Sequence, residues 1–199
     1  MGYRLVSLLL FAVVLGACGK EIGDACVINT DCDPNGGRIC DTLSKDGYCT
    51  IAGCDYSTCP GEAACIRFFT GSFSKACDPV CDSIYNPQIS ACPAPVPPKV
   101  QCSLDEVCAI SDQCVPRSSE IRFCMRKCNS DGDCRDGYEC RDVAQMKADG
   151  GEPLFAPGQV MDDQGQVVDL TQKDANGNPK VVASHGPKFC AMKPVVPTP

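Results

Sequence analysis

The sequence predicts a small disulfide-rich fold that has little regular secondary structure, contains short β-hairpins and is preceded by a signal-peptide helix. Three observations lead to this prediction. The chain of 199 residues contains 19 cysteines, a density that is typical of disulfide scaffolds. It has no tryptophan and seven phenylalanines, so it is poor in the large side chains of an ordinary core. An apolar run, Leu5 to Leu15, lies near the N-terminus.

The N-terminal segment, residues 1–17, has the features of an export signal. Arg4 and the terminal amine supply positive charge, and eleven apolar or small residues follow, from Leu5 to Leu15. A helix of that length rises about 16 Å, whereas about 20 residues are needed to span a bilayer. The segment is therefore predicted to direct export and to be removed.

The residues Leu15-Gly16-Ala17-Cys18 resemble the lipobox of bacterial lipoproteins. In that family a peptidase cleaves before the cysteine, whose sulfur already carries a diacylglycerol. The resemblance implies lipidation of Cys18, including acyl chains such as palmitate, and a tether at residues 18–25. Gly16 departs from the usual Ala or Ser, and Gly19 implies outer-membrane sorting. Two alternatives stay open: cleavage as an ordinary secretory signal, and Cys18 as a retained thiol.

Eighteen cysteines remain without Cys18, and this even number can close as nine disulfides. Sixteen of them form four groups with similar gaps, and two are left as an extra pair. The predicted groups are Cys26, Cys32, Cys40 and Cys49; Cys54, Cys59, Cys65 and Cys77; Cys102, Cys108, Cys114 and Cys124; and Cys128, Cys134, Cys140 and Cys190; the extra pair is Cys81 and Cys92. The short gaps are rich in turn-forming residues, which bring cysteines close enough to bond.

The groups define the predicted organisation of the exported chain. N-terminal modules occupy residues 26–92, a Pro-rich spacer occupies 93–101, and C-terminal modules occupy 102–190 with an excursion at 141–189; residues 191–199 form a tail. Apart from the lipidated Cys18, 17 cysteines precede residue 141. An odd number cannot pair completely, so Cys190 must bond to one of them. If the first cysteine of each module bonds to the third and the second to the fourth, the partner of Cys190 is Cys134.

The lipobox, the groups with five-residue gaps and the stretch Cys128-Asn-Ser-Asp-Gly-Asp-Cys134-Arg-Asp-Gly-Tyr-Glu-Cys140 resemble cysteine-rich lipoproteins that myxobacteria and their relatives encode. The resemblance covers most of residues 15–140. It implies a location at the outer membrane, facing the periplasm or the cell surface, and a disulfide architecture. It implies no activity.

The excursion, residues 141–189, contains no cysteine and is rich in turn signals. Gln159-Val160-Met161 and Gln166-Val167-Val168 flank one turn and are predicted to pair as a hairpin, with Val181-Val182 as a third strand. Because binding residues concentrate in loops held by a rigid scaffold, function is expected in this segment.

Several kinds of chemistry lack their residues. No C-x2-C motif is present, which argues against thioredoxin-like redox chemistry and haem attachment. The chain has a single histidine, His185, and no pair of acidic residues is spaced for acid–base catalysis. We therefore expect no enzyme and no cofactor other than the covalent lipid.

Calcium is a weak candidate ligand. Asp31-Cys-Asp33-Pro-Asn35-Gly36 matches the first half of a calcium-binding loop, although Thr42 stands where a bidentate Glu is required. A second set of oxygens is offered by Asn129, Asp131 and Asp133. In both places the alternative is that these residues form turns between bonded cysteines.

The charge of the chain excludes one class of partner. Without the leader, 17 basic residues stand against 25 acidic ones, a net charge of −8, so nucleic acid is not an expected partner. The sequence favours a non-enzymatic, membrane-anchored lipoprotein with a binding or envelope-structural role, whose protein or carbohydrate partner is not specified. The alternative is a secreted, disulfide-stapled inhibitor or toxin-like module.

Overall fold

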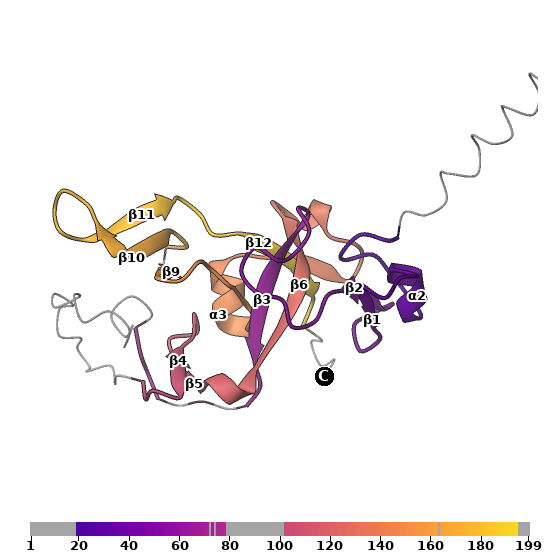
Figure 1. Cartoon of the computed structure of the whole chain (residues 1–199), viewed down its shortest axis with the longest axis horizontal. Coiled ribbons are helices and arrows are strands. Elements are labelled where there is room, and N and C mark those ends of the chain that lie inside the picture. The colour runs from indigo at the N-terminus through magenta and orange to yellow at the C-terminus, as the bar shows by residue number, and fades with distance from the viewer. Residues whose placement is uncertain (1–18, 72, 74, 79–101, 163, 195–199) are drawn as a thin grey trace, which may run out of the picture.

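The structure is a computed structural model that describes residues 19–71, 73, 75–78, 102–162 and 164–194 (Figure 1). The predicted signal-peptide helix, the lipidation residue Cys18, the extra pair Cys81 and Cys92, and the Pro-rich spacer lie outside these residues. Among the described residues, no helix is both long enough and apolar enough to cross a membrane.

The first module shows the unit from which the fold is built. A short helix, α2 (Asn29–Cys32), precedes a hairpin of β1 (Ile39–Asp41) and β2 (Tyr48–Thr50). The third and fourth cysteines lie directly opposite each other on the two strands. They therefore share one face of the hairpin, where they bond to the first and second cysteines. The bonds are Cys26–Cys40 and Cys32–Cys49.

The fourth module repeats this arrangement. A 3₁₀ turn, η2 (Asp131–Asp133), replaces the short helix, and β7 (Tyr138–Arg141) pairs with β12 (Lys188–Met192). The bonds are Cys128–Cys140 and Cys134–Cys190. The second bond is the one that the sequence favoured for Cys190, and it closes the excursion.

The second and third groups differ from the predicted grouping, because they exchange their outermost cysteines. Cys124 closes the second module instead of the third, and Cys77 opens the third module instead of closing the second. With this correction both modules follow the same first-to-third and second-to-fourth pairing. The third module is thus inserted into the second. The bonds are Cys54–Cys65, Cys59–Cys124, Cys77–Cys108 and Cys102–Cys114.

The strands of these two modules obey the same geometry. β3 (Ala63–Phe69) pairs antiparallel with β6 (Glu120–Cys128) over seven positions, with Cys65 opposite Cys124. β4 (Glu106–Cys108) pairs with β5 (Cys114–Pro116), again with the third cysteine opposite the fourth. A 3₁₀ turn, η1 (Arg117–Ser119), connects β5 to β6. All four described modules therefore share one cross-link pattern.

A five-stranded sheet joins the second module to the fourth, in the order β7-β12-β6-β3-β8, where β8 is Glu152–Pro153. The shared strand is β6, since it carries the last cysteine of the second module and the first of the fourth. The chain is therefore more regular than the sequence indicated. The prediction of a small disulfide-rich fold with short antiparallel strands is confirmed.

The excursion contains a second sheet. β9 (Gln159–Met161), β10 (Val167–Lys173) and β11 (Pro179–Ala183) form an antiparallel sheet in the order β11-β10-β9. The predicted hairpin and its third strand are confirmed. A helix that the sequence analysis did not predict, α3 (Val143–Asp149), precedes this sheet. Figure 1 shows that the β10–β11 hairpin extends away from the five-stranded sheet.

The core is divided between disulfides and two apolar clusters. One cluster surrounds Ile22 and Tyr48 between the first module and the five-stranded sheet. The other lies beneath α3, where Ile66, Met146 and Phe189 are buried. Small clusters of this kind fit a chain with few large apolar residues, because the cross-links restrict the unfolded chain and compensate for limited burial.

Candidate functional site

The calcium candidates of the first module hold a turn together. The side chain of Asp31 accepts hydrogen bonds from the backbone N–H groups of Val27 and Ile28, at 2.8 and 3.2 Å. The Asp33 carboxylate accepts from the N–H of Asn35 at 2.8 Å. A hydrogen bond thus joins Asp33 to Asn35, and these contacts fit the alternative in which the three candidates are turn residues.

The candidates of the fourth module behave in the same way. Asp133 accepts from the N–H groups of Asn129 and Ser130, at 2.7 and 3.0 Å. Asp131 accepts from the N–H of Cys140 at 2.8 Å. Backbone donors are therefore already directed at the oxygens that would bind a cation.

These hydrogen bonds also shift the ionisation of two carboxyl groups. The N–H groups of Val27 and Ile28 lower the pKa of Asp31, and those of Asn129 and Ser130 lower the pKa of Asp133. The charged form is favoured because the donors stabilise a negative oxygen. A calcium ion would have to compete with these backbone groups for the same atoms.

The cysteine sulfurs are committed to cross-links. All sixteen cysteines in the described part of the chain belong to the eight disulfides given above. Some of their sulfurs cluster closely enough to resemble metal sites, but a disulfide sulfur is not the thiolate that zinc or iron sites use.

A pocket of about 390 Å³ lies where α3 meets the two loops at the base of the excursion's sheet. One loop includes Gly165 and the other includes Gly186. They are tied by a hydrogen bond from the N–H of Gly186 to the carbonyl of Gly165, at 2.8 Å. A Cβ on Gly165 would approach Val143 to 2.6 Å, and one on Gly186 would approach the Met161 sulfur to 2.5 Å. The absence of side chains at these glycines lets both loops approach the apolar floor closely.

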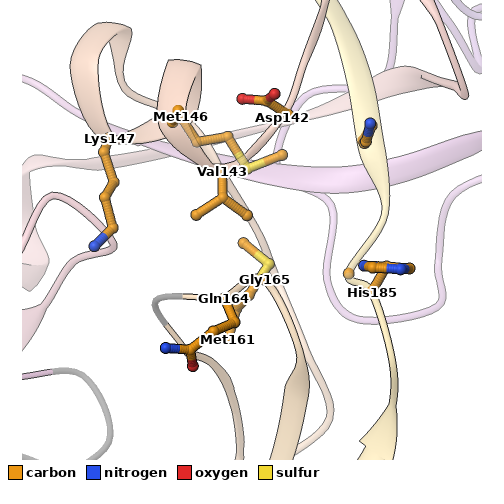
Figure 2. A pocket seen from close by; sticks show the side chains of 11 residues that line it. Asp142, Val143, Met146, Lys147, Met161, Gln164, Gly165 and His185 are labelled. Carbon is orange, nitrogen blue, oxygen red and sulfur yellow. The ribbon is translucent and has the colours of Figure 1, made fainter.

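The pocket combines an apolar floor with charged groups at its edge. Figure 2 shows Val143, Met146 and Met161 between Lys147 on one side and His185 on the other. Met146 and Met161 are 1% and 5% exposed, so their sulfurs belong to the packed core below.

The edge of the pocket carries more positive than negative charge. Lys147 and Lys188 supply two cations, and Asp142 supplies one carboxylate. The Nζ atom of Lys147 lies 3.3 Å from a carboxylate oxygen of Asp112, so its charge is partly compensated. Asp142 caps α3 by accepting a hydrogen bond from the N–H of Gln145. The side chain of Lys188 is exposed at the start of β12.

The second candidate site is the hairpin arm, residues 171–185, which comprises the end of β10, the turn, β11 and the residues that follow. Every residue of the arm is exposed except the half-buried Pro179. Two apolar side chains, Val181 and Val182, are 49% and 41% exposed. The segment 141–189, where the sequence led us to expect function, thus offers two candidate places, the pocket at the base of the excursion and the arm at its end.

The pocket was not predicted from the sequence, although a signal for α3 is present. Asp142 and Gln145 form a reciprocal capping box, and Gly150 follows the helix. A capping box followed by a glycine is the ordinary pattern of a short helix. The loops that complete the pocket carry no comparable pattern.

The chain matches no protein-family model, no curated protein and no solved structure. The fold and site themselves establish a cysteine-rich, disulfide-stapled small domain. Its extensive cross-linking indicates an extracellular or exported protein, because such bonds persist in oxidising compartments.

Proposed function

We propose that the protein is a lipid-anchored, non-enzymatic binding or structural protein of the bacterial outer membrane and that the hairpin arm is its recognition element. The observation that carries the proposal is the exposure of the arm. A formed hairpin exposes two valines and almost every other side chain along fifteen residues. Exposed loops on a rigid scaffold are where proteins place recognition residues.

The scaffold below the arm supports this function, because it is fixed on both sides. The strand that follows the arm, β12, carries Cys190, which is bonded to Cys134. The hydrogen bond between Gly186 and Gly165 joins the two loops at the base of the arm. A partner that binds the arm therefore meets an element whose base is already ordered, which reduces the entropy lost on binding.

The tip of the arm favours a binding protein over a protease inhibitor. The carboxylate of Asp174 accepts hydrogen bonds from the N–H groups of Asn176 and Asn178, and the Asp174 N–H donates to the Asn178 carbonyl. The tip is thus a tight, internally bonded turn. A segment that binds in the way of a protease substrate, by adding to an edge strand, must instead be extended. Its backbone groups are then open to the partner.

Anchoring is supported by the lipobox-like residues Leu15 to Cys18. A cysteine that carries several acyl chains binds membranes stably, whereas a single chain does so marginally. We expect wild-type protein to incorporate labelled palmitate and to partition into detergent. The variant Cys18→Ser is expected to take up no label and to accumulate with its leader attached. Label on the variant, or none on the wild type, would remove the lipid anchor from the proposal.

The role of the arm is tested with a photo-crosslinking residue at Val181 in cells that express the protein. The matched control places the same residue at Leu43, which is 92% exposed in the first module and far from the arm in sequence. We expect a discrete adduct from position 181 and none of that mass from position 43. The same adduct from both positions, or none from position 181, would contradict recognition by the arm.

A further inference from the structure

The pocket below α3 has the composition of a small-molecule site. Its floor of Val143, Met146 and Met161 is apolar, and Val143 is the most exposed of the three. Small-ligand sites combine such a surface with a few placed polar groups. The hydrogen bond between the loops of Gly165 and Gly186 means that the walls are formed without a ligand.

The volume sets the size of the occupant. A pocket of about 390 Å³ lies at the lower end of the range for small-molecule sites. A compound with about ten non-hydrogen atoms fits this space.

The charge at the edge sets the sign of the ligand's polar group. His185, in the loop, and Lys188, at the start of β12, both line the pocket. Figure 2 shows Lys147 across from His185. The carboxylate of Asp142 is oriented by the N–H of Gln145, and Asp112 already neutralises part of the Lys147 charge. Because Lys147 already contacts Asp112, Lys188 is the lysine that we assign to an anion.

We propose that this pocket binds a small amphiphile, a carboxylate carried on a short apolar chain, with the chain over Met146 and Met161 and the carboxylate at Lys188. The pocket is distinct from the hairpin arm, so the proposal stands independently of recognition by the arm and of the lipid anchor.

The experiment uses octanoate as the probe and the methionine methyl groups as reporters. Protein labelled with ¹³C at these methyl groups is titrated with octanoate and observed by NMR. We expect saturable shifts of the Met146 and Met161 signals. Met192, which is 40% exposed and lies outside the pocket, serves as the internal control and should not shift. An absence of saturable shifts at Met146 and Met161, or equal shifts at Met192, would overturn the proposal.

Two comparisons test the role of charge. Heptyltrimethylammonium has the same seven-carbon chain with a positive group and is expected to bind more weakly than octanoate. The variant Lys188→Gln is expected to weaken octanoate binding by roughly fivefold, the effect of one partly exposed ion pair. Lys193→Gln removes a lysine just beyond β12 that does not line the pocket and should leave the affinity unchanged. Equal binding of the cationic probe, or no effect of Lys188→Gln, would overturn recognition of a carboxylate.

Discussion

Asp31 in the first module and Asp133 in the fourth make the same pair of hydrogen bonds. Each carboxylate accepts from the N–H groups of the two residues that follow the first cysteine of its module. The two turns are 102 positions apart in sequence, counted from Asp31 to Asp133, and each ends directly before the second cysteine of its module. The equivalence extends to Asn29 and Asp131, whose side chains both accept from the N–H of the third cysteine.

The equivalence supplies a variant and its control. Asp133→Ala removes the acceptor of two N–H groups, and the amides of Asn129 and Ser130 are expected to exchange with solvent roughly tenfold faster. Asp131→Asn should leave exchange of the Cys140 amide nearly unchanged, because Asn29 already performs that role in the first module. Hydrogen exchange measured by NMR checks both. An accelerated Cys140 amide in Asp131→Asn would contradict the equivalence of the two modules.

Local sequence patterns predicted the elements whose partners lie close in the chain. The hairpin at Gln159 and Val167 was predicted because two short segments flank a turn, and the Cys134–Cys190 bond followed from a module register repeated elsewhere. The exchange of Cys77 and Cys124 was not predicted. Grouping by sequence order assigns each closing cysteine to the nearest open group, whereas pairing of β3 with β6 brings Cys65 to Cys124 across 58 intervening residues. The pocket was missed for the same reason, since its loops meet only after long-range packing.

The exchanged pairing can be checked directly. Peptide mapping under non-reducing conditions is expected to link the peptide of Cys59 to that of Cys124, and the peptide of Cys77 to that of Cys108. The reason is that β3 pairs along its whole length with β6 and places Cys65 opposite Cys124, and Cys59 lies only four residues before β3 begins. Bonds from Cys59 to Cys77 and from Cys108 to Cys124 would instead restore the grouping by sequence order.

Oxidative folding should depend on disulfide exchange. Each of the eight described bonds skips at least one cysteine that lies between its two partners in the sequence. Consecutive cysteines, however, meet most often in an unfolded chain. Reduced, unfolded protein is expected to recover native bonds poorly with oxidant alone and well in a glutathione redox buffer, where thiolates reopen wrong bonds. Non-reducing peptide maps measure the yield. Equal yields under the two conditions would show that the native pairs form first.

Gly47 should be far less tolerant of substitution than Gly36. Both have positive φ angles, of 65° and 83°, so an alanine at either position costs roughly 1–2 kcal/mol of backbone strain. At Gly47 the added Cβ would also lie 2.0 Å from the carbonyl oxygen of Cys26, whereas nothing lies within 4 Å at Gly36. Urea denaturation is expected to show a larger loss of stability for Gly47→Ala than for Gly36→Ala. Similar losses would mean that the loop around Cys26 adjusts freely.

Tyr48 joins the first module to the sheet through its buried phenol. The hydroxyl accepts a hydrogen bond from the N–H of Arg126 at 3.0 Å and points its own hydrogen toward the carbonyl of Cys190 at 3.4 Å. The ring stacks on Tyr138 with 5.4 Å between centroids. Burial raises the pKa of Tyr48 to about 12, because the charged phenolate would lose its hydration.

This raised pKa predicts a loss of stability at alkaline pH. The unfolded chain has an ordinary tyrosine pKa of about 10, so the folded protein holds the Tyr48 proton more tightly. The associated stabilisation is fully present below pH ~10 and is lost as the pH rises through ~12, to a total of about 3 kcal/mol. Phenolate absorbance during a rapid alkaline titration should show one tyrosine that ionises after the others, and Tyr48→Phe should abolish that last step. Denaturation curves at several pH values should show a correspondingly smaller alkaline loss in Tyr48→Phe. An unchanged late step in this variant would assign the perturbed phenol to another tyrosine.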